Sequence, residues 1–167
     1  MKLLDITNKI QKVKDDIIHD GYIMTISELS YTYKHEDMIF IPKLINHQVS
    51  SKTNSLIIES VLIGLPTPTI VVQHDTNGNW VVLNHTNFLL AVFGFMGILD
   101  KKNPDFEKFT NAQLMESKLI KKIGNILLED LPEDLRNGFL RTKINIQIML
   151  TKINRDTLIT NLKTMET

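Results

Sequence analysis

The sequence predicts an α/β (α+β) fold in which a small mixed β-sheet is packed by helices. Segments with helical periodicity alternate along the chain with short β-branched segments, a pattern typical of mixed folds. Two of the β-branched segments flank Asn77-Gly78, a pair typical of a β-hairpin turn. No internal repeat or linker divides the 167 residues, so we expect a single domain over residues 1–167.

The first predicted element is an N-terminal packing helix over residues 1–20. Apolar residues recur there at helical spacing, and Gly21 is expected to end the helix. A helix that binds a partner is the alternative interpretation. A second, short helix is expected to start within residues 25–28, where a Ser or Thr caps it and Glu28 supports its first turn.

Four β-branched or apolar segments are predicted strands. They are residues 38–41, 70–72, 80–83 and 144–150. Further helices are expected over residues 56–65, after Pro132 and over residues 155–162. The polar residues 43–54 read as an exposed loop. Residues 86–99 are apolar nearly all round, so we expect a central, buried helix there.

Charge and composition exclude several classes of function. Lys plus Arg equals Asp plus Glu at 19 each, so no overall field favours nucleic acid or membrane. The absence of cysteine excludes disulfides and thiolate chemistry and favours a cytoplasmic location. We expect no signal peptide and no membrane span. A basic cluster at Lys118, Lys121 and Lys122 is interpreted as a solvated face, with nucleic-acid contact as the alternative.

Five motifs, in order and spacing, carry a family resemblance. They are Ile26-Ser27-Glu28-Leu29, Ile41-Pro42, Leu56-Ile57-Ile58-Glu59-Ser60 with Gly64-Leu65-Pro66-Thr67-Pro68, Phe93-Gly94-Phe95-Met96-Gly97-Ile98-Leu99, and Leu131-Pro132-Glu133-Asp134-Leu135-Arg136. Over residues 22–160 the chain resembles the DUF262 family, the N-terminal domain of GmrSD-type restriction subunits in the ParB/sulfiredoxin-like superfamily. The resemblance implies a ParB/DUF262-like core. We expect the C-terminal nuclease domain of that family to be absent.

The resemblance also implies where a phosphate site would lie. Family members carry an Asp-Gly-Gln-Gln-Arg motif after the second hairpin strand, taken to bind nucleoside triphosphate or act on a phosphodiester. The corresponding residues here are Asn84, His85, Thr86, Asn87 and Phe88. An amide replaces the acid, a histidine replaces the glycine and a phenylalanine replaces the cation, so the chemistry that depends on acid and arginine is lost.

Two further family motifs are also altered. A Gln-Arg motif would fall near Leu44-Ile45-Asn46, where no cation is present, and His47-Gln48 would substitute only if the loop is shortened. A polar Arg-Leu-Asn stretch would fall in residues 161–164, which hold no arginine. We therefore expect no catalytic residue, no metal site and no cofactor. The predicted degenerate ligand pocket comprises Asn84, His85, Thr86, Asn87, Phe88, Asn46, His47 and Gln48.

The function predicted from these observations is that of a pseudoenzyme encoded by a phage or mobile element. It would regulate or inhibit a nucleic-acid-targeting defence system, such as restriction–modification, through contact with a protein partner. The alternatives are a nucleotide- or nucleic-acid-binding module without turnover, and a residual NTPase or nuclease. Self-association into a homo-oligomer is left open, and so is enzymatic activity, although we favour its absence.

Overall fold

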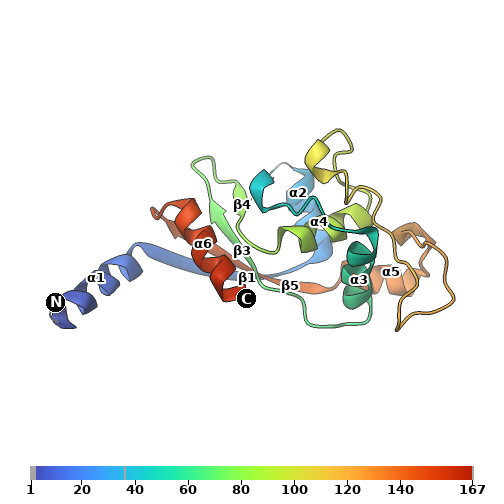
Figure 1. Cartoon of the computed structure of the whole chain (residues 1–167), viewed down its shortest axis with the longest axis horizontal. Coiled ribbons are helices and arrows are strands. Elements are labelled where there is room, and N and C mark those ends of the chain that lie inside the picture. Colours follow the sequence, from blue (N-terminus) through green and yellow to red (C-terminus); the bar gives the residue numbers. More distant parts are fainter. Residues whose placement is uncertain (1–2, 36, 167) are drawn as a thin grey trace.

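Helices and strands alternate along the computed structural model, which describes residues 3–35 and 37–166. The helices are α1 (Leu3–Asp15), α2 (Ile26–Lys34), α3 (Ser51–Leu62), α4 (Thr86–Phe95), α5 (Glu133–Leu140) and α6 (Arg155–Glu166). The strands are β1 (Ile17–Thr25), β2 (Met38–Phe40), β3 (Ile70–His74), β4 (Trp80–Val82) and β5 (Lys143–Thr151). The predicted fold class, a mixed sheet packed by helices, is confirmed (Figure 1).

The five strands form one mixed sheet in the order β1-β5-β3-β4-β2. β5 pairs antiparallel with β1 and parallel with β3, so it lies next to the centre of the sheet. β3 and β4 pair antiparallel as the predicted hairpin. Gly78 occupies its turn with φ +82°, a backbone conformation that glycine adopts without steric cost. β1 and β2 are the two edge strands.

Hydrophobic clusters cover both faces of the central strands. Ile70 and Val72 of β3 belong to the large cluster that includes side chains of α2, α3, α4 and α5. Val71, which lies between them, belongs to a second cluster with Leu158 and Ile159 of α6. Side chains of a strand alternate between its two faces, so this division follows directly from the sequence. Burial on both faces explains why β3 reads as a continuous apolar run.

α4 is the most buried helix, as its composition predicts. Eight of its ten residues are buried. It ends at Phe95 and not at residue 99, because Gly97 has φ +68° and terminates the helix. The N–H of Ile98 donates to the carbonyl of Phe93 at 3.1 Å, and the N–H of Gly97 donates to that of Gly94 at 3.0 Å. These two hydrogen bonds form a Schellman motif.

The start of α2 confirms the predicted cap. The Thr25 hydroxyl accepts a hydrogen bond from the N–H of Glu28 at 3.2 Å, and the Glu28 carboxylate accepts one from the N–H of Thr25 at 2.6 Å. This reciprocal pair is a capping box. The hydrogen bonds from the Thr25 backbone and side chain lower the pKa of Glu28, because they stabilise its ionised form.

The structure departs from the predicted N-terminal helix over residues 1–20. α1 ends at Asp15, and Ile17–Thr25 forms β1, with Gly21 inside the strand. Nine residue pairs join β1 to β5, from Ile17 opposite Thr151 to Thr25 opposite Lys143. This long-range pairing outweighs the local helical periodicity. None of the described residues of α1 is buried, so the helix does not pack into the core.

Two smaller differences concern the predicted loop over residues 43–54. A 3₁₀ turn occupies Pro42–Leu44, and α3 already begins at Ser51. The Ser50 hydroxyl caps α3 by accepting a hydrogen bond from the N–H of Thr53 at 3.1 Å.

In the part of the chain that the structure describes, no helix is both long and apolar enough to cross a bilayer.

Gly94 provides a test of the packing between α4 and the following segment. A Cβ atom at Gly94 would lie 1.9 Å from the carbonyl oxygen of Phe109, so the backbone must shift. We expect Gly94→Ala to lower the free energy of unfolding by about 3 kcal/mol or more. Gly138→Ala, in α5, meets nothing within 4 Å and should raise it by about 0.5–1 kcal/mol. Urea unfolding measures both, and equal effects would contradict this packing.

Candidate functional site

The side chain of Asn84 joins the end of β4 to β3. Its Oδ1 atom accepts a hydrogen bond from the N–H of Val71 at 2.7 Å, and its Nδ2 atom donates to the carbonyl of Thr69 at 3.3 Å. An ionised carboxylate has no donor for the Thr69 carbonyl, so the second bond requires an amide. Both ends of the Asn84 side chain are therefore used inside the fold.

His85 connects the start of α4 to the end of α6. Its backbone is left-handed, with φ 47° and ψ 32°, a conformation in which histidine is enriched among non-glycine residues. The carbonyl of His85 accepts hydrogen bonds from Phe88 and Leu89, which begin the helix. The His85 Nε2 atom lies 3.6 Å from Oε1 of Glu166, so protonation of the imidazole completes an ion pair between the two helices.

The remaining residues of the turn face the interior or a neighbouring loop. Thr86 is buried and its hydroxyl oxygen has no hydrogen-bond partner among the described residues. Phe88 is partly buried and packs against the large hydrophobic cluster. The Oδ1 atom of Asn87 accepts a hydrogen bond from the backbone N–H of Asn46 at 3.0 Å, so the structure brings these two predicted site residues together.

The loop beside Asn87 is held by its own contacts. The Asn46 Oδ1 atom accepts a hydrogen bond from the N–H of Gln48 at 3.0 Å. His47 Nε2 lies 3.8 Å from Oδ1 of Asp105, whereas His85 faces Glu166. The two histidines thus have different acidic neighbours. Over residues 3–35 and 37–166, no three His, Cys, Asp or Glu side chains gather as a metal site would require.

These contacts describe a structural joint more than a ligand pocket. Asn46, Asn84 and Asn87 use their side-chain amides on backbone groups, and His47 and His85 lie beside carboxylates. Among the described residues, five surface cavities have volumes of about 320–740 Å³, and none of these five is lined by a residue of the two segments. Neither segment contains an Asp, Glu, Lys or Arg residue. The nearby acids are Asp105 beside His47 and Glu166 beside His85.

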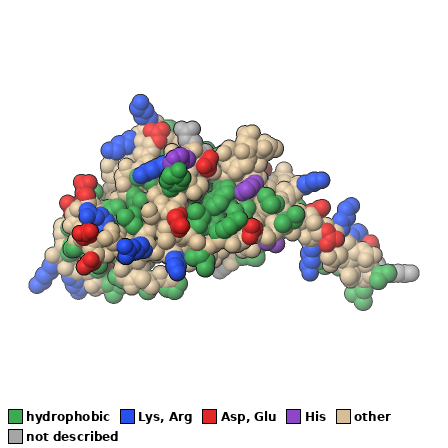
Figure 2. Space-filling model, turned by 180° about the vertical axis from the view of Figure 1, so that it is seen from behind, with side chains coloured by type: hydrophobic (Ala, Val, Ile, Leu, Met, Phe, Trp, Pro, Cys, Tyr) green, Lys and Arg blue, Asp and Glu red, His purple; other side chains and the backbone are tan. Residues whose placement is uncertain are grey.

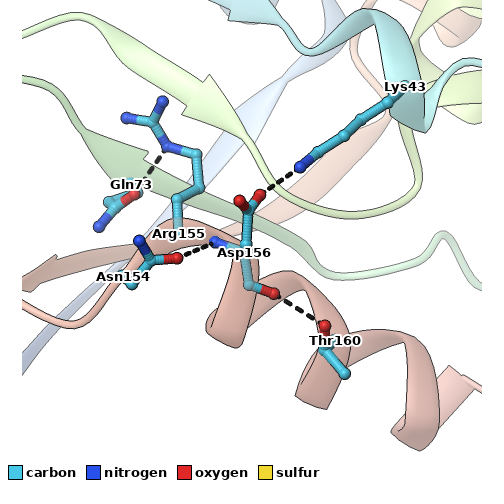
Figure 3. A network of polar contacts seen from close by, with 6 residues as sticks. All are labelled: Lys43, Gln73, Asn154, Arg155, Asp156 and Thr160. Carbon is cyan, nitrogen blue, oxygen red and sulfur yellow. Dashed lines mark hydrogen bonds and ion pairs between the residues drawn. The ribbon is translucent and has the colours of Figure 1, made fainter.

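A second polar network lies at the start of α6 (Figure 3). The Arg155 Nε atom donates a hydrogen bond to Oε1 of Gln73 at 2.9 Å, and Gln73 is buried in β3. Lys43 forms an ion pair with Asp156, whose N–H is capped by Oδ1 of Asn154 at 2.8 Å. The network ties α6 to the sheet and to the 3₁₀ turn that follows β2.

Two carboxylates near Arg155 have lowered pKa values. The hydrogen bond from Lys43, together with its charge, lowers the pKa of Asp156. Burial alone would raise the pKa of Asp75, but hydrogen bonds from Asn79 and Asn77, with the charge of Arg155, lower it overall. The sequence reasoning missed this network. The available signal was Gln73 itself, a polar residue directly after the apolar residues of β3. A buried polar side chain requires a hydrogen-bond partner, so its position indicated a polar contact.

Glu59 is a further residue that sequence reasoning missed. It lies in α3, is buried, and lines the largest of the five cavities together with Lys118 and Lys121. Its signal was a single carboxylate inside the apolar Leu56–Leu62 segment.

Comparison of the chain with family models, curated proteins and solved structures gives no match.

The Asn84 joint makes a prediction for stability. We expect Asn84→Ala to lower the free energy of unfolding by about 1–3 kcal/mol, because the N–H of Val71 then loses its partner. Asn87→Ala is the matched control, because its hydrogen bond to Asn46 is exposed, and it should cost clearly less. Urea unfolding compares the two variants. An equal or smaller loss for Asn84→Ala would contradict a structural role for this amide.

The network at α6 makes a prediction for pH. Asp75 and Asp156 have lowered pKa values in the fold, so their stabilisation is present above the unfolded pKa of about 3.9. It is lost as the pH falls through the folded values. We expect the free energy of unfolding to decrease when the pH is lowered beyond about 4. Asp156→Asn should make this decrease with pH less steep. An unchanged slope in urea unfolding of Asp156→Asn between pH 5 and pH 2.5 would contradict this account.

Proposed function

We propose that this chain is a degenerate DUF262-like protein that acts by protein–protein contact and not by catalysis. Its target would be a nucleic-acid-targeting defence system, which it regulates or inhibits on behalf of a phage or mobile element. The observation that carries the proposal is α1, an amphipathic helix that projects from the body of the molecule with its apolar side chains in water (Figure 1).

The apolar side chains of α1 follow the spacing of a helix–helix interface. Leu3, Ile6, Ile10 and Val13 are separated by three, four and three residues, as in the seam of a coiled coil. Their exposed fractions lie between 37% and 83%. A helix of 13 residues is marginally stable in water on its own, so contact with a partner would stabilise it as well as bury its seam.

β1 extends this surface onto the sheet. It is an edge strand that pairs with β5 alone among the described strands, and its other edge offers backbone N–H and C=O groups to a partner. Ile18, Tyr22 and Ile23 are exposed large side chains of β1. We call α1 and β1 together the N-terminal surface. Figure 2 shows this helix standing apart from the rest of the molecule, with hydrophobic side chains at its outer end.

The geometry of the predicted pocket supports a non-catalytic role. The Asn84 side chain is held by two hydrogen bonds, one to Val71 of β3 and one to Thr69 just before that strand. Phe88 packs against the core where the family would place an arginine. Loss of a single transition-state contact typically costs about 2.7–4 kcal/mol, so the loss of several leaves little activity. For the same reason the turn does not favour nucleotide binding at residues 84–87, the alternative raised by the sequence.

The choice of target rests on the resemblance to GmrSD-type restriction subunits. A protein that keeps the core of such a subunit without its acid and arginine would compete for the surfaces by which active subunits assemble. Contact through the N-terminal surface requires no chemistry from residues 84–88. Self-association through the same surface is the competing outcome, and the molar mass in solution distinguishes it from binding to the enzyme.

The proposal predicts inhibition of DNA cleavage that depends on α1. Purified chain should slow cleavage by a DUF262-type restriction enzyme, and Ile10→Lys should raise the half-inhibitory concentration at least about tenfold, since a charge in the seam opposes burial. Asn8→Lys adds the same charge on the opposite face of α1 and should inhibit like the wild type. Both residues are exposed, so each variant should change stability by less than about 0.5 kcal/mol.

Two results would contradict the proposal. One is the absence of any change in cleavage with excess wild-type chain across several enzymes of this type. The other is equal inhibition by wild type, Ile10→Lys and Asn8→Lys, which would place the contact away from the seam of α1. Light scattering of the chain alone identifies self-association, since a dimer that Ile10→Lys disrupts would assign the seam to a second copy.

A further inference from the structure

A cavity of about 410 Å³ opens at the end of α4. Its lining comes from residues 94–97, Lys101, residues 110–113, residues 127–129 and Arg136. Its volume lies within the range of small-molecule sites, roughly 300–1,000 Å³. None of these residues belongs to the N-terminal surface or to the predicted degenerate pocket, so what the cavity holds does not depend on the function proposed above.

Arg136, in α5, is the arginine of this lining and is partly buried. Its side chain forms no hydrogen bond and no ion pair with any residue that the structure describes. None of its nitrogen atoms is among the unpartnered polar atoms sealed from solvent, so all of them can be reached from outside. A guanidinium has five N–H donors and keeps its charge. These donors are therefore free for an acceptor that the chain itself does not supply.

Lys101 adds a second positive charge to the same lining. It is exposed and forms no ion pair within 4.0 Å among the described residues. Glu129 is the acid of the lining, and no ion pair joins it to Lys101 or to Arg136. The lining thus has two cations against one carboxylate, and its excess charge favours an anion.

The end of α4 offers these two cations a different role, which the hydrogen bonds do not support. Cations stabilise helix C-termini by binding the last carbonyl groups. Here the carbonyls of residues 92–94 accept hydrogen bonds from the N–H groups of residues 96–98. Neither Arg136 nor Lys101 donates to them from its side chain. The helix end is satisfied by its own backbone, so the charges remain available to a ligand.

The rest of the lining is largely apolar. Its large apolar residues are Phe95, Met96, Leu127 and Leu128. The side-chain amide of Gln113 has no hydrogen-bond partner among the described residues and, like Arg136, is not sealed from solvent. An apolar lining with a few polar groups is typical of small-ligand sites.

We propose that this cavity binds a small organic anion, in which a phosphate or carboxylate group is joined to an apolar body. Arg136 binds two oxygens of the anionic group through parallel N–H donors, a geometry that guanidinium makes with both kinds of group. Lys101 adds a point charge, and Gln113 adds a neutral donor. The apolar body lies against Met96 and the leucines at 127 and 128. An inorganic anion leaves that surface uncovered, and a neutral ligand leaves the two charges unpaired.

Calorimetric titration of the wild-type chain with phenyl phosphate and with phenylacetate tests the proposal. At least one of them should bind with a dissociation constant below about 1 mM, and at least about tenfold more tightly than inorganic phosphate or acetate, which lack the apolar body. Benzyl alcohol, which has no charge, should give no heat. The comparison of the two probes identifies the anionic group. No heat with either probe at millimolar concentration would overturn the proposal.

Matched variants place the binding in the cavity. Arg136→Gln should weaken binding of the probe at least about tenfold. Arg141→Gln should bind like the wild type, because Arg141 is exposed just after the same helix and does not line the cavity. Lys101→Gln should weaken binding and Lys102→Gln should not, since Lys102 lies outside the lining. Glu129→Gln should tighten binding, because it removes a charge of the same sign as the ligand.

Thermal unfolding checks that Arg136→Gln is folded. If it is not, the exposed pair Lys101→Gln and Lys102→Gln decides, because neither substitution removes a buried side chain. Equal binding by folded Arg136→Gln and Arg141→Gln, equal binding by the two lysine variants, or weaker binding by Glu129→Gln would each overturn the assignment of the anion to this cavity.

Discussion

The parallel pair of β3 and β5, buried on both faces, is the constraint on which the rest of the structure depends. Val72 faces the large cluster, and Val71 faces α6. The Asn84 amide joins the β4–α4 junction to this buried strand through Val71, and to the residue before the strand through Thr69. The same joint sets the place where α4 enters the core.

This constraint explains why side chains of the turn at residues 84–88 are engaged inside the fold. A residue that must donate to one backbone carbonyl and accept from a backbone N–H cannot also serve as a free acid. Phe88 fills space against the core, and His85 faces the end of α6. The features without an internal use lie elsewhere, on the seam of α1 and in the cavity that Arg136 and Lys101 line.

Local signals predicted much of the fold. The Asn77-Gly78 turn, the apolar run of α4 and the alternation in β5 each depend on neighbours in sequence, and the structure has all three elements. β1 was not predictable in this way, because Ile17 and Ile18 also fit a helical period and the strand is fixed by β5, more than 100 residues away. Asn84 was assigned to the predicted ligand pocket, because its hydrogen-bond partner 13 residues earlier depends on the hairpin register. The surroundings of Glu59 were likewise not predictable from its neighbours in sequence, because residues 116–121 line the same cavity.

The most direct test of the central claim, that function has moved from the turn to the surface, is hydrogen–deuterium exchange of the chain with and without a DUF262-type restriction enzyme. Exchange reports local opening and burial of each backbone segment. The account predicts slower exchange on binding over residues 3–25, which form α1 and β1, and no change at residues 46–48 or 84–88. Protection confined to residues 46–48 and 84–88, with α1 unchanged, would contradict it.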